Sequence, residues 1–240
     1  MSMYQGTGIY TLAEAARLAR APVAAINRWL YGHQQTKERK GESHTYKSNP
    51  LWEPQYQPEF LGEKVIGFQD LLELRVVREF VNHGVPVSVI RRCLDTAKQL
   101  YGTTHPFTTN RFATDGKTIF ADIVRHGQEQ EMVDLRGKQL VFREIIKPSL
   151  YAGIEYDGKF ARRWFPGGAK QKQVVIDPEQ QFGKPLLTEE GISTEAIYAN
   201  FKVEGGDKIA MGRVAKIFEI HPRKVEAAIR FEDDLRRKVA

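Results

Sequence analysis

Four residues near the N-terminus, Ala24, Asn27, Arg28 and Tyr31, have the spacing and the chemistry of a surface that reads bases in duplex DNA. Steps of three and four residues keep them on one side of a helix. An asparagine amide can bond an adenine edge through two hydrogen bonds, an arginine can bond guanine, and a tyrosine can reach a phosphate or sugar. A helical hairpin packed in a core has the same spacing, so the spacing alone leaves both interpretations open.

Basic residues cluster around this set, as phosphate contacts require. The whole chain has 36 Lys plus Arg against 30 Asp plus Glu, a formal charge of +6 and a pI near 9.3, which favours acidic partners such as nucleic acid. The basic run at 37–40 can also be a plain solvated face. The predicted DNA contacts are Thr11, Arg17, Arg20, Ala24, Asn27, Arg28, Tyr31, Lys37, Arg39 and Lys40.

Two short helices must position these residues. Thr11 is expected to cap a helix over 12–19, with Glu14 completing a capping box. Pro22 is suited to the start of a second helix that extends to residue 31, because the amide it lacks would have no partner in the first turn. The apolar side of that helix is expected to hold Val23, Ile26 and Leu30, which is helix-turn-helix spacing.

The rest of the first hundred residues alternates between loop and helix. No periodic pattern extends from 32 to 59, so a long loop is predicted there. Helical periodicity resumes at Phe68 and stops at His83-Gly84, and a further helix runs from Pro86 to Tyr101. These two helices form a second pair.

The remaining sequence predicts a β-rich centre and a helical end. Asp115-Gly116 and Asp157-Gly158 are turn pairs typical of two β-hairpins. The predicted division is a DNA-binding domain at 1–102, a central β-rich segment at 103–165, a linker at 166–173 and a helical domain at 174–240. Its helices are expected near 193–204, 207–218 and 222–238. The fold class is α+β, mostly α.

The last two of these helices have the spacing of a second helix-turn-helix, with Val225 and Ile229 on its buried face. Acidic residues on the last helix would repel phosphate, which favours a protein partner over DNA. A plain helical bundle is an equally good interpretation. The acidic residues in question are Glu226, Glu232, Asp233 and Asp234.

No pattern favours an enzyme, a metal or a cofactor. The histidines lack metal-binding spacing and are expected at the surface or in loops: His33, His44, His83, His105, His126 and His221. Cys93 is the single cysteine and lies in an amphipathic helix, not in a nucleophile motif. Asp115, Asp122 and Asp134 form no ordered set of the kind that a metal-dependent ribonuclease needs. The N-terminus has no signal-peptide pattern, so a cytoplasmic location is expected.

Two stretches resemble known families. Residues 10–29, with Tyr10-Thr-Leu-Ala-Glu-Ala-Ala, and residues 66–90, with Ile66-Gly-Phe-Gln-Asp, resemble the MerR-type winged-helix regulators. The family's turn glycine is replaced by Arg20, and its wing by the longer segment 32–65. Residues 175–185, with Val-Ile-Asp-Pro and Phe-Gly-Lys-Pro, and the helices that end in Val225-Glu-Ala-Ala-Ile229-Arg-Phe resemble VapB-like antitoxins. Together with the MerR-like front, this resemblance to an antitoxin extends over nearly the whole chain.

The second resemblance implies a toxin partner with a PIN-like ribonuclease fold. The leading hypothesis is an antitoxin that neutralises this toxin and represses its own operator, with no cofactor, and a homodimer is expected because paired half-sites need two readers. Arginines that enter the acidic pocket of the toxin would form charge-assisted bonds there. The alternative is a MerR-like transcriptional regulator that responds to a ligand and has no toxin partner. The predicted toxin contacts are Arg162, Arg163, Arg223, Arg230, Arg236 and Arg237.

Overall fold

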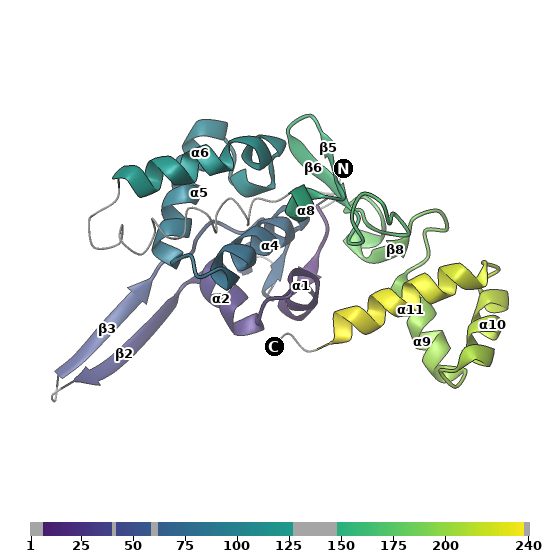
Figure 1. The fold of residues 1–240 in the computed structure, drawn as a ribbon. Coiled ribbons are helices and arrows are strands. Elements are labelled where there is room, and N and C mark those ends of the chain that lie inside the picture. Colours follow the sequence, from purple (N-terminus) through teal and green to yellow (C-terminus); the bar gives the residue numbers. More distant parts are fainter. Residues whose placement is uncertain (1–6, 40–41, 59–61, 127–147, 238–240) are drawn as a thin grey trace. The chain divides into compact units, whose positions relative to one another are not determined.

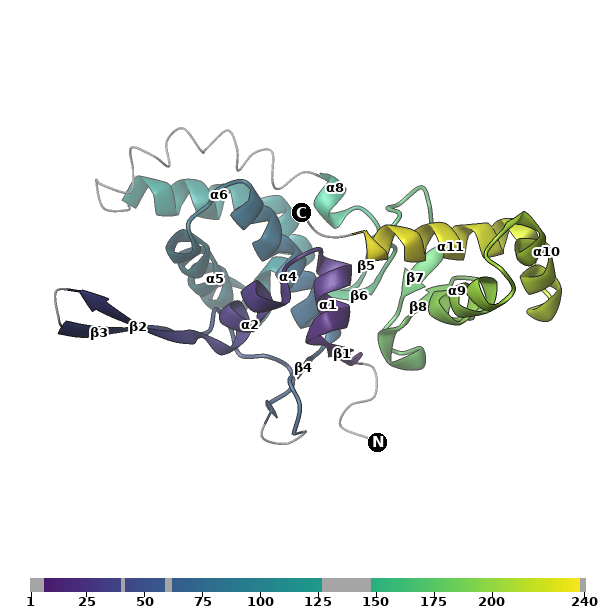
Figure 2. The ribbon, with the colours of Figure 1, turned by 90° about the horizontal axis from the view of Figure 1, so that it is seen from below.

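The chain, in a computed structural model, divides into two compact units (Figures 1 and 2). The structure describes residues 7–39, 42–58, 62–126 and 148–237. The N-terminal unit comprises Tyr10–Leu150, and the C-terminal unit comprises Tyr151–Ala240 together with Met1–Ile9. The expected α+β class with mostly helices is confirmed.

The N-terminal unit is built around one buried helix, α4. Its apolar residues Leu71, Leu74, Val77 and Phe80 are fully buried, and α1 and α5 pack on it. The helices of this unit are α1 (Leu12–Ala19), α2 (Val23–Tyr31), α4 (Phe68–Asn82), α5 (Val87–Tyr101), η1 (Pro106–Thr108) and α6 (Asn110–His126). Its strands are β1 (Tyr10–Thr11), β2 (His33–Arg39), β3 (Glu42–Ser48) and β4 (Val65–Ile66).

Two small antiparallel sheets complete this unit. β1 pairs with β4, so that Thr11 lies opposite Val65 and the chain before α4 is tied to the start of α1. β2 and β3 form a hairpin that projects from the end of α2 (Figure 1). The long loop predicted for 32–59 is therefore wrong over 33–39 and 42–48. The hairpin is polar throughout, so it has no apolar alternation that would have revealed its strands.

The hairpin predicted at Asp115-Gly116 is also wrong, because 110–126 is the helix α6. Thr109 caps this helix by accepting the Phe112 amide at 3.2 Å. Phe112, Ile119 and Phe120 are buried at a spacing of seven and eight residues, which is helical. Packing of this apolar side overrides the turn preference of Asp-Gly.

The C-terminal unit packs two of its last three helices against one face of a four-stranded antiparallel sheet, and the third packs on those two helices. The strands are in the order β5 (Ile154–Asp157), β6 (Phe160–Trp164), β7 (Val174–Ile176) and β8 (Pro185–Leu187). Because side chains alternate across a strand, Val174 and Leu187 face the helices, whereas Val175 and Leu186 pack with Phe165. The helices are α9 (Thr194–Val203), α10 (Lys208–Ile217) and α11 (Pro222–Arg236), as predicted.

The sheet changes the domain boundaries expected from the sequence. The hairpin at Asp157-Gly158 is confirmed as β5 and β6, but β6 pairs with β7, so that Trp164 lies opposite Ile176. The segment 166–173 therefore connects two strands of one sheet and is not an interdomain linker. The boundary moves to Tyr151, within the short helix α8 (Pro148–Tyr151). The expected central segment 103–165 is thus divided between the two units.

Candidate nucleic-acid interface

The helices α1 and α2 and the turn between them form as the sequence predicts. The Thr11 hydroxyl accepts the Glu14 amide at 3.2 Å, and Glu14 accepts the Thr11 amide at 2.8 Å, which is a complete capping box. Arg20 ends α1 in the left-handed conformation with φ of 54°. Arg78 from α4 donates to the Ala19 carbonyl at 3.1 Å, and so holds the turn against the core.

The outward side of α2 carries the predicted reading residues. Ala24 and Arg28 are exposed, and Asn27 and Tyr31 are half-buried. The buried stripe of α2 is Ala25, Ile26, Trp29 and Leu30. Val23 was expected on that stripe and is 45% exposed. It lies in the first turn, about 90° from the centre of the stripe when each residue turns the helix by about 100°.

The basic residues predicted to contact DNA lie on several elements near the outward side of α2. Arg17 is exposed on α1, and among the described residues neither Arg17 nor Arg28 forms an ion pair. Lys37 and Arg39 lie on β2, whereas Lys40 lies outside the described residues. The structure therefore brings Thr11, Arg17, Arg20 and the α2 residues into one pair of helices, from which the hairpin extends.

Sequence reasoning missed one residue at this surface. Lys64, 37 positions after Asn27 in the chain, donates from Nζ to Asn27 Oδ1 at 2.8 Å. The same ammonium lies 4.6 Å from the centre of the Tyr31 ring, and the Tyr31 hydroxyl donates to the Val65 carbonyl at 3.5 Å. No local sequence signal marks Lys64, because the pairing of β1 with β4 is what carries it to α2.

The base of the β2–β3 hairpin is held at a defined place beside α2. The Leu51 amide donates to the Trp29 carbonyl at 2.7 Å, and Arg91 from α5 donates to the carbonyls of Asn49 and Pro50. Gly32 joins α2 to the hairpin with φ of 70°, and a Cβ there would lie 2.3 Å from the Ser48 carbonyl oxygen. A glycine is therefore required at this junction.

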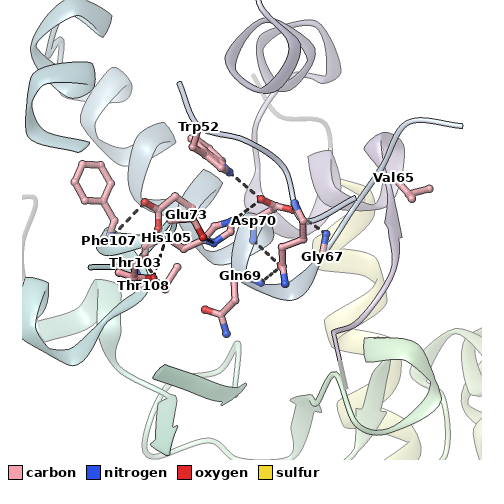
Figure 3. Close-up of polar contacts among 12 residues, drawn as sticks. Trp52, Val65, Gly67, Gln69, Asp70, Glu73, Thr103, His105, Phe107 and Thr108 are labelled. Carbon is pink, nitrogen blue, oxygen red and sulfur yellow. Dashed lines mark hydrogen bonds and ion pairs between the residues drawn. The ribbon is translucent and has the colours of Figure 1, made fainter. Parts of the chain in front are cut away.

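A buried polar cluster fixes α4 to the segments on either side of it (Figure 3). Asp70 is fully buried and accepts from Trp52 Nε1 at 2.8 Å and from the amides of Gln55 and Gly67 at 2.9 and 3.0 Å. His105 Nε2 lies 2.7 Å from the same carboxylate. His105 was expected at the surface or in a loop, but it is a buried structural residue. Its ring is a hydrogen-bond partner for the buried carboxylate of Asp70, and a buried polar group without such partners would destabilise the fold.

Glu73, one turn after Asp70, is also fully buried. It accepts the amides of Phe107 and Thr108 at 3.2 and 3.1 Å. Burial raises the pKa of Glu73 well above its ordinary value, and the charge of Asp70 adds to this, while the two amide bonds oppose it. Both carboxylates thus hold the chain around η1 and are inaccessible for catalysis.

The other side chains considered for catalysis or metal binding are either buried or not gathered in one place. Cys93 is buried in α5, and burial raises the pKa of its thiol to about 12, so it is not a reactive nucleophile. Within the described ranges, no three His, Cys, Asp or Glu side chains gather as metal ligands. Asp115 lies half-buried on α6, while Asp134 is outside the described residues. No helix among those described is long and apolar enough to cross a membrane.

The predicted toxin-binding arginines all lie in the C-terminal unit, but most have partners within it. Arg163 donates to Glu155 at 2.7 Å, and Arg236 pairs with the buried Glu232 and stacks on Tyr198. Exposed ion pairs join Arg162 to Glu179, Arg230 to Glu226 and Arg237 to Asp234. In the part of the chain that the structure describes, Arg223 is exposed at the start of α11 and forms no ion pair.

The chain is similar to known proteins over most of its length. No protein-family model matches it. A protein of Mycobacterium tuberculosis strain H37Rv with the provisional name antitoxin VapB45 is 26% identical over 192 residues, which cover 77% of this chain and 78% of the relative. The X-ray crystal structure of Rv2018 from Mycobacterium tuberculosis matches with a TM-score of 0.67 and 23% identity, over 92% of this chain and 96% of that one. The chain is thus a distant homologue of the first protein and shares the fold of the second.

Proposed function

We propose that the chain is the antitoxin of a toxin–antitoxin module, and that it acts by binding without catalysis. The observation that carries this proposal is the similarity to a protein provisionally named antitoxin VapB45 over more than three quarters of both chains. A shared domain alone would cover only part of each protein. The enclosed Asp70, Glu73 and Cys93 agree with a non-catalytic role.

The α1–α2 pair is the proposed DNA-binding surface. It presents exposed Arg17 and Arg28, which form no ion pair among the described residues and are therefore available to phosphates or guanine. In this proposal α2 enters the major groove as the second helix of a helix-turn-helix, and the β2–β3 hairpin acts as a wing beside it. Binding of two half-sites would require a homodimer.

The C-terminal unit is the proposed toxin-binding part, with a PIN-like ribonuclease as its partner. Arg223 could enter an acidic pocket without first losing an ion pair. The exposed pairs Arg230–Glu226 and Arg237–Asp234 contribute roughly 0–1 kcal/mol each, so these two arginines can change partner at little cost. Arg236 would leave the buried Glu232 unpaired and is a poor candidate.

The first test is an interaction test for both partners. The full chain is produced together with the product of the adjacent reading frame, and the mass of the copurified complex is measured. A gel shift with the promoter of the same operon tests the DNA half, with Arg28→Ala as the variant and Lys216→Ala, an exposed residue of α10, as the control. The proposal expects a stable complex and a loss of promoter affinity of about tenfold for Arg28→Ala only. A chain that binds neither partner contradicts it.

A further inference from the structure

Lys64 contacts Asn27 on the outward side of α2. Lys64 is exposed, and its backbone is fixed because the next residue, Val65, pairs with Thr11 in the β1–β4 sheet. Its ammonium reaches Asn27 Oδ1 at 2.8 Å and the Tyr31 ring at 4.6 Å. Three side chains from two segments therefore form one defined group on the outward side of α2.

This contact changes what Asn27 can offer to a base. A free asparagine reads adenine by accepting from the N6 amino group and donating to N7. In this chain the Asn27 oxygen already accepts from an ammonium, and the donors that remain in this group are the amide NH₂ and the other N–H bonds of Lys64. An adenine amino group brought to this oxygen would also face the positive charge of Lys64.

Guanine presents the complementary pattern. Its major-groove edge carries two acceptors, N7 and O6, and no donor, so it matches a group that only donates. Cytosine offers a donor amino group and is disfavoured for the same reason as adenine. We infer that Lys64 and Asn27 act together as a guanine-reading pair, in which Lys64 converts an adenine-type residue into one that selects guanine. This inference rests on the proposed binding of DNA by α2.

The test is selection from a randomised duplex DNA library with the full-length chain and its variants. The wild-type chain is expected to select sites with a guanine at the position that Asn27→Ala makes indifferent. Lys64→Met removes the charge and the donors while keeping the chain length. It is expected to change the preference at that position from guanine to adenine, with a change in the guanine-to-adenine affinity ratio of about tenfold or more.

Two controls separate base reading from simple charge. Lys64→Arg keeps a cation that can still donate, so the guanine preference should remain. Lys98→Met, at an exposed position near the end of α5, removes a lysine of the same unit outside the proposed DNA-binding surface and should leave the preference unchanged. Circular dichroism establishes that every variant is folded.

The possible results distinguish this inference from the proposed function. If Lys64→Met lowers affinity by the same factor for all four bases, or changes nothing, the guanine-reading pair is wrong while DNA binding stands. If Asn27→Ala retains the base preference at every position, the pair is also wrong. If the wild-type chain selects no duplex, DNA binding by this chain is wrong, and this inference is wrong with it.

Discussion

Asp70 and Glu73 show how two carboxylates on one face of α4 can have different surroundings. Asp70 receives two backbone amides, an indole N–H and an imidazole nitrogen, whereas Glu73 receives two backbone amides only. The hydrogen bonds to Glu73 therefore offset only part of the free-energy cost of removing its charge from water. Burial is the main cause of its raised pKa. Neither group is placed for chemistry, and both connect α4 to its neighbouring segments.

This difference predicts a pH dependence of stability. The folded-state pKa of Glu73 lies above its ordinary value of 4.5, so its contribution is fully present below that value and is lost as pH rises through the folded pKa. Glu73→Gln cannot titrate, so the decrease in the free energy of unfolding above pH 4.5 should be smaller than in the wild type. Urea unfolding at a series of pH values measures this.

The control for Glu73 is Glu195→Gln, an exposed residue of α9, which should keep the wild-type slope. Glu73→Gln is also expected to be less stable at low pH by about 1 kcal/mol, because one amide loses its acceptor. An unchanged slope in Glu73→Gln would mean that other groups cause the pH dependence.

At the scale of elements, one helix-ending motif occurs at four turns in the part of the chain that the structure describes. In each, one backbone N–H donates to the carbonyl five residues earlier, and the N–H of the preceding residue donates to the carbonyl three residues before it. The N–H groups of Ala21 and Ile220 form the longer bond of this kind. The motif needs a residue in the left-handed conformation. Gly84 and Gly205 supply it at two turns, while Arg20 and Glu219 have φ of 54° and 55° at the others. In both helix pairs, the one proposed for DNA and the one in the unit proposed for the toxin, a non-glycine residue therefore occupies a left-handed conformation that is unfavourable for it.

Glu219→Gly should accordingly stabilise the chain. A left-handed non-glycine residue costs roughly 1–2 kcal/mol, and the extra freedom of glycine in the unfolded chain offsets part of the gain. We expect the free energy of unfolding to rise by about 0.5–1 kcal/mol, measured by urea denaturation. Glu219→Ala keeps the Cβ and should change little. If glycine and alanine have equal effects, strain at this turn is not the cause.

At the scale of the whole molecule, the two units have separate cores and carry the two proposed activities separately. α1, α2 and the hairpin belong to the N-terminal unit, and every arginine proposed for the toxin belongs to the C-terminal unit. Substitutions on exposed arginines of one unit that form no ion pair among the described residues should therefore leave the other activity intact, because sites that share no partner act additively.

Arg28→Ala and Arg223→Ala test this separation directly. Arg28→Ala should lower operator affinity by about tenfold and preserve copurification with the toxin, because only the N-terminal unit is changed. Arg223→Ala should weaken the toxin complex and preserve the gel shift. The double variant should show both losses in full. Loss of both activities in each single variant would contradict separate sites.

Local patterns in the sequence were sufficient for most helices and for the proposed reading side of α2. The capping box at Thr11, the break at Pro22 and the apolar spacing of the last three helices act over a few residues, so the sequence alone determines them. The polar hairpin, the helix at 110–126 and the sheet that spans 166–173 depend on partners distant in the chain. For the same reason, only tertiary structure placed Lys64 on Asn27 and buried His105 against Asp70.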